Sequence, residues 1–205
     1  MHFVSRFTGA VAVAASVLAI QAGAQTVQFT GFTNGCFGVA CVVESTNVND
    51  TDVNAGLTYR NSTFNLFTSA GFASVGNAPA NPNIDNLGSF ALSGLASSYS
   101  GPFFLRVNFT SPTTTNSIFS AVLTGNVTST DVGGVFINFD NTMQTFNYAG
   151  GTFQFSVNDL SVVAGGIVAV TGNIQANVVP EPSTYMLMAA GLAGLGLISR
   201  RRRVA

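Results

Sequence analysis

The segment FFLRVNF at residues 103–109 decides the fold class, because large apolar side chains alternate through it with a period of two. Phe103, Leu105, Val107 and Phe109 would lie on one face of an extended strand, and the residues between them on the other. One buried and one solvent-facing side is typical of a strand in an antiparallel sheet. The segment therefore predicts a β-strand that covers a core with one of its faces.

Other segments extend this pattern along the chain. GVFINFD at 134–140 and GTFQFSVND at 151–159 alternate in the same way. Further candidate strands are Thr26–Phe32, Leu57–Phe67, Phe90–Leu95, Ile118–Thr124 and Ile167–Ala176. Turn-rich segments such as 76–89 separate them. Short strands at this spacing predict an all-β domain, namely an antiparallel β-sandwich (jelly-roll-like or Ig-like), with a barrel as the alternative.

Charge is scarce, at 7% of the chain, and lysine is absent. Residues 25–179 hold two arginines, Arg60 and Arg106, against seven acids, a net charge of −5. Two scattered arginines cannot displace the counterions of a phosphate backbone, so we expect no nucleic-acid partner.

Catalytic groups are equally scarce, because the same range has neither His nor Lys. A Ser-His-Asp triad or a Ser-Lys dyad cannot be built without these residues. Glu44 with Asp50 or Asp52 could form a glycosidase-type pair, but seven acids spread over the domain are more simply surface charges. We therefore expect no catalytic residues, no cofactor and no enzymatic activity.

The N-terminal segment predicts export. Arg6 precedes an apolar stretch over 9–20, and Ala22-Gly23-Ala24 forms an A-x-A cleavage site. These features define a signal peptide over 1–24, removed by signal peptidase so that the mature chain begins at Gln25. An anchor helix is the alternative, although about 12 apolar residues fall short of the roughly 20 that span a bilayer.

The C-terminal segment predicts a membrane tail over 180–205. Pro180-Glu181-Pro182 favours extended chain, and an uncharged stretch over 183–199 follows it. As a helix the stretch would measure about 25 Å, enough for a thin bilayer. Arg200, Arg201, Arg202 and Arg203 come next and would stay cytoplasmic.

This order of Pro-Glu-Pro, short Gly/Ala/Leu-rich helix and terminal arginines resembles the PEP-CTERM sorting signal. The resemblance covers about 26 residues and says nothing of the activity of the exported domain. It implies a Gram-negative host, passage through the inner membrane, transient anchoring by the helix, and processing by an intramembrane exosortase before display at the cell surface or release. A plain single-span anchor, with small residues Ala190 and Gly194 spaced for self-association, is the alternative.

Two small motifs remain in the exported domain. Cys36 and Cys41 lie close together and, in an oxidising compartment, predict a disulfide, with two free thiols as the alternative. Asp50, Asp52 and Asn54 alternate as in a calcium loop, but Gly56 falls one position late for an EF-hand. We expect an Asp/Asn-rich turn there and keep only a weak calcium interpretation.

Two functions remain open. In the first, residues 25–179 form a non-enzymatic surface or extracellular-matrix protein, which the C-terminal tail directs to the cell surface or the medium. The second is a carbohydrate-binding module on the same tail, which the resemblance favours because that family is associated with exopolysaccharide. The second is weakened by the absence of Trp and by the small number of Tyr, since sugar platforms use exposed aromatic side chains.

Overall fold

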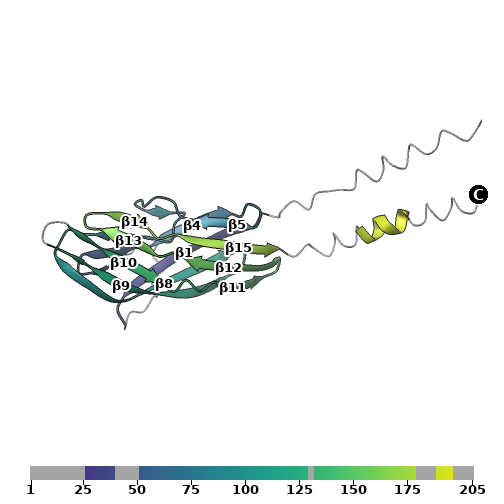
Figure 1. Ribbon diagram of the computed structural model, residues 1–205. Helices are drawn as coiled ribbons and strands as arrows, with labels where there is room; N and C mark the ends of the chain where they lie inside the picture. The colour runs from purple at the N-terminus through teal and green to yellow at the C-terminus, as the bar shows by residue number, and fades with distance from the viewer. Residues whose placement is uncertain (1–25, 40–50, 129–131, 179–187, 196–205) are drawn as a thin grey trace, which may run out of the picture.

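The computed structural model describes residues 26–39, 51–128, 132–178 and 188–195, and residues 28–178 of these ranges form two packed layers of β-sheet (Figure 1). The strands are β1 (Gln28–Phe37), β2 (Thr51–Asn54), β3 (Leu57–Arg60), β4 (Ser62–Phe67), β5 (Phe72–Val75), β6 (Asn83–Ile84), β7 (Ser89–Leu92), β8 (Ser97–Ser111), β9 (Thr115–Val127), β10 (Gly133–Phe139), β11 (Gln144–Tyr148), β12 (Gly151–Val157), β13 (Leu160–Val163), β14 (Ile167–Ala169) and β15 (Gly172–Val178). The predicted all-β class is confirmed.

The first layer is a seven-stranded sheet in the order β13-β10-β9-β8-β1-β4-β6. Its centre is the long antiparallel hairpin of β8 and β9, whose register runs from Ser97 opposite Val127 to Phe109 opposite Thr115. β1 adds to the other side of β8 and pairs antiparallel with β4. The segment 103–109 therefore lies at the middle of this sheet, between β9 and β1.

The second layer consists of two four-stranded sheets placed end to end. We call the sheet with the order β11-β12-β15-β5 the β12 sheet, and the sheet with the order β14-β7-β3-β2 the β7 sheet. The chain from β14 to β15 passes from one to the other. Between these strands Val170 donates its N–H to the Gly88 carbonyl (2.8 Å) and accepts from the Leu87 N–H (2.9 Å). Backbone hydrogen bonds therefore continue across the junction of the two sheets.

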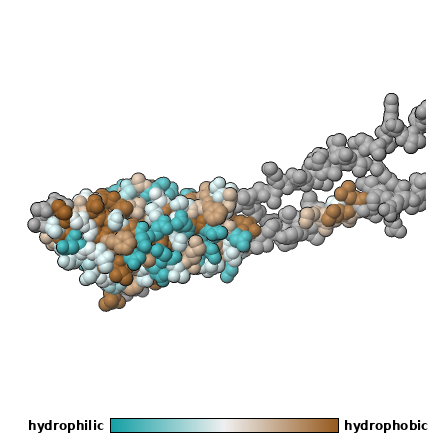
Figure 2. All heavy atoms as spheres, viewed as in Figure 1, coloured by the Kyte–Doolittle hydropathy of each residue, from teal (hydrophilic) through white to brown (hydrophobic). Residues whose placement is uncertain are grey.

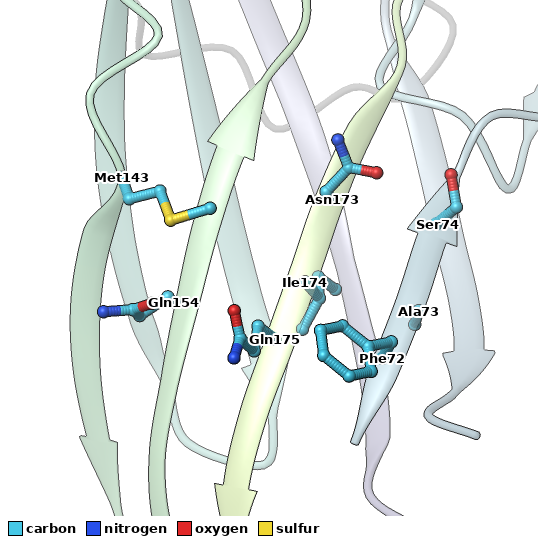
Figure 3. A pocket seen from close by; sticks show the side chains of 8 residues that line it. All are labelled: Phe72, Ala73, Ser74, Met143, Gln154, Asn173, Ile174 and Gln175. Atoms are coloured by element: carbon cyan, nitrogen blue, oxygen red, sulfur yellow. The ribbon is translucent and has the colours of Figure 1, made fainter. Parts of the chain in front are cut away.

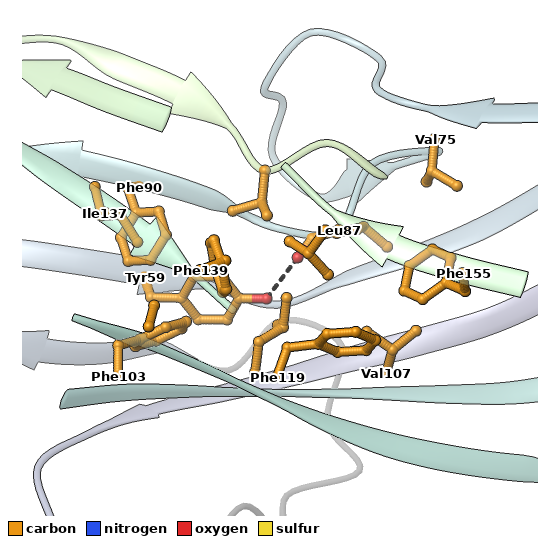
Figure 4. Packing of buried hydrophobic residues seen from close by; sticks show 14 of the residues in the cluster. Tyr59, Val75, Leu87, Phe90, Phe103, Val107, Phe119, Ile137, Phe139 and Phe155 are labelled. Carbon is orange, nitrogen blue, oxygen red and sulfur yellow. Dashed lines mark hydrogen bonds between the residues drawn. The ribbon is translucent and has the colours of Figure 1, made fainter. Parts of the chain in front are cut away.

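The core lies between the layers and is largely aromatic (Figure 4). Phe103 on β8 packs against Tyr59 and Phe90 of the β7 sheet, with ring centroids 4.9 Å away in both cases. Phe109, further along β8, packs against Phe153 of the β12 sheet at 5.1 Å. Aromatic pairs in such tilted and edge-to-face arrangements stabilise by more than their buried area alone. One strand thus contacts both halves of the opposite layer.

Tyr59 is the polar member of this core. Its hydroxyl donates to the Leu87 carbonyl at 2.7 Å (Figure 4) and lies 3.1 Å from Thr33 Oγ1. Burial raises its pKa well above the usual value for tyrosine. Gly35 of β1 makes room for the ring, since a Cβ at this position would lie 2.5 Å from atoms of both Tyr59 and Phe103. The hydroxyl therefore has a structural role and does not reach solvent.

The predicted faces are confirmed, but several predicted strands have other limits in the structure and two of them are each divided into two strands. The inward residues of 103–109, 134–140 and 151–159 are all buried. The expected strand Leu57–Phe67 is interrupted at Asn61, and its halves β3 and β4 belong to different layers. The expected strand Ile167–Ala176 is also divided, into β14 of the β7 sheet and β15 of the β12 sheet, which lie in the same layer. The interruptions occur because each half pairs with a different partner strand, which periodicity does not reveal.

Candidate functional site

The structure describes only the middle of the C-terminal tail. Residues 188–195 are helical, within the predicted membrane span 183–199, and Met188 and Leu192 are 61% and 65% exposed. Among the described residues we find no helix whose length and apolar character would suffice to cross a membrane. The motif Pro180-Glu181-Pro182 and the arginines at 200–203 lie outside the described residues, so their roles stay predictions.

Two further predicted features lie partly or wholly outside the described residues. The cleavage site at Ala22 and Ala24 is one of them. Cys36 is described and lies on the outer face of the seven-stranded sheet, opposite Phe104 and only 9% exposed. Cys41 is not described, so the Cys36–Cys41 disulfide stays a prediction.

Each carboxylate that the structure describes accepts a backbone N–H. The pairs are Asp52 with Phe37 (2.8 Å), Asp85 with Asn65 (2.7 Å), Asp140 with Thr142 (3.1 Å) and Asp159 with Phe139 (2.8 Å). A carboxylate in this arrangement stabilises a turn or a strand end. Its oxygens are then engaged in local structure.

The segment considered for calcium forms a strand over Thr51–Asn54, and the expected turn is confined to Ala55 and Gly56, before β3 begins. Asp52 and Asn54 lie on β2, and the second oxygen of Asp52 accepts the Val53 N–H at 2.9 Å. Asp50 lies outside the described residues. Within the described ranges no group of three or more His, Cys, Asp or Glu side chains could hold a metal. The structure therefore adds no ligand to the weak calcium interpretation.

A shallow groove of about 390 Å³ lies on the outer face of the β12 sheet (Figure 3). Its lining comes from three strands and one loop: Phe72, Ala73 and Ser74 of β5, Gln154 of β12, Asn173, Ile174 and Gln175 of β15, and Met143 before β11. The register places Gln175 between Gln154 and Phe72, and these three residues form one row across the sheet. The groove is thus a product of strand pairing.

The chemistry of this groove is uncharged. Its three amide side chains each carry donors and an acceptor. Asn173 Nδ2 donates to Asn158 Oδ1 at 2.9 Å, whereas the Gln175 amide has no hydrogen-bond partner among the described residues. Phe72 is 59% exposed and Met143 54% exposed at opposite sides of the groove. Gln154 Nε2 in turn donates to Thr145 Oγ1 at 3.5 Å. An aromatic face beside the free Gln175 amide suits a ligand with hydroxyl groups and an apolar ring face.

Sequence reasoning about aromatic side chains missed this arrangement. Tyr59 and Tyr99 are 0% and 3% exposed, so neither can form a sugar platform. The ring that lines this groove is instead Phe72, in a short strand that was not predicted. Its neighbour Gln175 lies about 100 residues further along the chain. A local pattern carries no signal for such a pairing.

Apolar side chains also gather at the end of the sandwich where β10, β13 and β14 lie (Figure 2). Exposed apolar residues of these strands are Phe136 (43%), Val163 (66%) and Ile167 (65%). Apolar patches on a soluble domain are a common feature of interaction sites. This surface and the groove belong to different regions of the domain.

The described domain is thus an all-β sandwich whose carboxylates serve its own turns, and it precedes an apolar C-terminal helix and an arginine cluster. The family model of the PEP-CTERM protein-sorting motif matches residues 178–203. The chain therefore carries a PEP-CTERM sorting motif, which marks an exported protein of the Gram-negative cell envelope that exosortase processes. No curated protein and no solved structure matches the chain significantly.

Proposed function

We propose that residues 25–179 form a non-enzymatic surface or extracellular-matrix protein. Signal peptidase removes residues 1–24, and the tail 180–205 holds the domain transiently at the inner membrane until exosortase acts. The observation that carries the proposal is the sorting motif at residues 178–203. After processing, the domain would be displayed outside the cell. There its surface, which carries few charges, can contact matrix components.

Two features of the domain support a non-enzymatic role. Residues 25–179 contain no His and no Lys, which removes the commonest general bases at neutral pH. The four described carboxylates accept backbone N–H groups, as described above. Recognition then depends on the surface, through the uncharged groove and the apolar patch.

The test of the sorting role separates the two parts of the tail. Replacing Pro180, Glu181 and Pro182 with alanine should leave export and membrane insertion intact while blocking processing. Replacing the four terminal arginines with glutamine should let the tail slip through the membrane and release unprocessed precursor, because each arginine costs roughly 2.5–3.5 kcal/mol at the centre of a membrane helix. If the Pro-Glu-Pro variant is processed and displayed like the parent in an exosortase-positive host, the tail is a simple anchor.

Intact-mass analysis of the exported protein tests the other expected processing steps. An N-terminus at Gln25 supports the signal peptide, and an intact Met1 in the exported fraction contradicts it. A Cys36–Cys41 bond lowers the mass by about two hydrogens and links two peptides in a non-reducing map. Labelling of both thiols in fresh protein contradicts the bond.

The second candidate function, carbohydrate binding, is favoured by the groove on the β12 sheet. The amides of Gln154, Asn173 and Gln175 match the paired donor and acceptor character of sugar hydroxyls. Phe72 offers a ring face on which the apolar side of a sugar can pack. The groove has no charged lining residue, so the ligand would be a neutral polysaccharide.

Polysaccharide pull-down with the exported protein tests this candidate. Phe72→Ala should abolish retention on the bound polysaccharide, because it removes the exposed aromatic face of the groove. Phe136→Ala is the matched control, since its ring is exposed on the other layer. Equal retention of the two variants, or no retention of the parent on any neutral polysaccharide, removes carbohydrate binding and leaves the first function standing.

A further inference from the structure

The strand β11 (Gln144–Tyr148) is the last strand of the β12 sheet, and its outer side is an unpaired sheet edge. It lies along the margin of the sandwich (Figure 1). The backbone groups of such an edge can pair with a strand of another chain. Soluble proteins prevent this pairing with very short edge strands, charged side chains, proline, bulges or a covering segment.

The other edge strands of the described sheets have protections of this kind. β6 has two residues and β14 has three. β2 has four residues and carries Asp52, and β13, also of four residues, follows directly on Asp159. On β5, the N–H of Phe72 donates to the Ser69 carbonyl at 3.0 Å and its carbonyl accepts the Ser69 N–H at 2.7 Å. Short, charged or already bonded edges pair poorly with another chain.

β11 has none of these protections. With five residues it is the longest edge strand of the described sheets, and its sequence QTFNY contains no charged residue and no proline. Its register with β12 runs from Gln144 opposite Phe155 to Tyr148 opposite Gly151 without a bulge. The edge therefore offers an uninterrupted and uncharged row of backbone groups to a further strand.

The hairpin between β11 and β12 determines which of these backbone groups are free. Its loop has two residues, so the flanking residues Tyr148 and Gly151 form a hydrogen-bonded pair. Hydrogen-bonded pairs alternate with non-hydrogen-bonded pairs along an antiparallel ladder, so Phe146 also bonds to β12. The N–H and C=O groups of Thr145 and Asn147 therefore point away from the sheet, and both side chains are exposed.

The free groups of β11 are complementary to those of a second β11. When two copies run antiparallel with Phe146 opposite Phe146, Thr145 of each copy faces Asn147 of the other. Each facing pair then exchanges both of its N–H···O=C bonds. The two Phe146 rings, each half-buried and stacked on Phe153 at 4.9 Å, meet at the symmetry axis. Neither strand brings a charge that would repel the other.

We infer that β11 is a self-association edge, through which two copies of the exported domain pair antiparallel about a two-fold axis at Phe146. Two-fold contacts are the commonest in homo-oligomers. The pairing joins two β12 sheets into one continuous sheet and places both grooves on the same face. Because a single short edge makes a small interface, the dimer is weak and forms where the protein is concentrated.

Sedimentation velocity of the exported protein at increasing concentration tests this inference. Asn147→Pro removes an outward N–H of β11 and no bond to β12, so the fold should persist. The association constant should fall about tenfold or more, because the symmetric dimer loses this hydrogen bond twice. Ser74→Pro is the matched control and should dimerise like the parent, since Ser74 holds the corresponding outward position on β5, at the opposite edge of the same sheet.

Two further measurements complete the test. Thr145→Lys keeps the backbone donors but places a charge on the edge, so it should also weaken the dimer and serves if Asn147→Pro does not fold. The amide protons of Thr145 and Asn147 should exchange about twofold more slowly in the parent when half of it is dimeric. A parent that stays monomeric, a dimer that survives both β11 variants, or an equal loss in Ser74→Pro overturns the inference.

Discussion

Replacing Phe109 with alanine tests the packing of the two layers at its centre. Its ring is 1% exposed. Five rings surround it at centroid distances of 5.1–6.3 Å, those of Phe29, Phe64, Phe146, Phe153 and Phe155. A buried Phe→Ala change costs about 3–5 kcal/mol, and the cost rises with the cavity that remains. Because β-strands in both layers hold the surrounding rings, the cavity cannot collapse, and we expect about 4–5 kcal/mol. Tm should fall by about 8–20 °C.

Guanidinium denaturation of the exported protein, followed by circular dichroism, measures this loss. Phe136→Ala is the control, since the same change at a ring 43% exposed on the outer face should cost less than about 1 kcal/mol. If Phe109→Ala does not fold, Phe109→Leu serves instead, with an expected loss of roughly 1–2 kcal/mol. A loss at Phe109 no larger than that at Phe136, with an unchanged denaturant slope, would refute the packing described here.

Two further predictions concern polar side chains. Tyr59→Phe should lower the free energy of unfolding by about 1–3 kcal/mol, because it leaves the buried Leu87 carbonyl without its donor. Tyr148→Phe is the control and should be neutral or slightly stabilising, because the Tyr148 hydroxyl has no partner among the described residues. Similar losses in both variants would contradict the role of the Tyr59 hydroxyl. The hydrogen bonds from the Thr142 hydroxyl and backbone N–H lower the pKa of Asp140 in the folded protein. This contact therefore stabilises the fold at pH values above the pKa of the unfolded state. The stabilisation is lost as the pH falls through the lower pKa of the folded state. Thr142→Val should raise the pKa of Asp140 toward its ordinary value in an NMR titration, and an unchanged pKa would exclude the hydroxyl as its cause.

The extent to which the fold could be predicted differs from element to element. Alternation in 103–109 correctly assigned the inward residues because the face of a strand depends only on local geometry with a period of two. The strand β11 was missed, although Phe146 and Tyr148 alternate with polar residues, because it is short and lies at a sheet edge. The break at Asn61 was missed because Leu57–Phe67 reads as one extended segment, and only the two partner strands show that it changes layer.

The sites divide in the same way. The sequence alone determined the sorting motif, because the Pro-Glu-Pro, the apolar run and the arginines act through their order along the chain and need no tertiary partner. It also shows that residues 25–179 contain neither His nor Lys. Only the tertiary structure placed Phe72 beside Gln175 and β11 at the edge of its sheet. Cross-strand pairing is a non-local choice of register, set by how whole strands bury their apolar faces against each other, and no single segment contains that information.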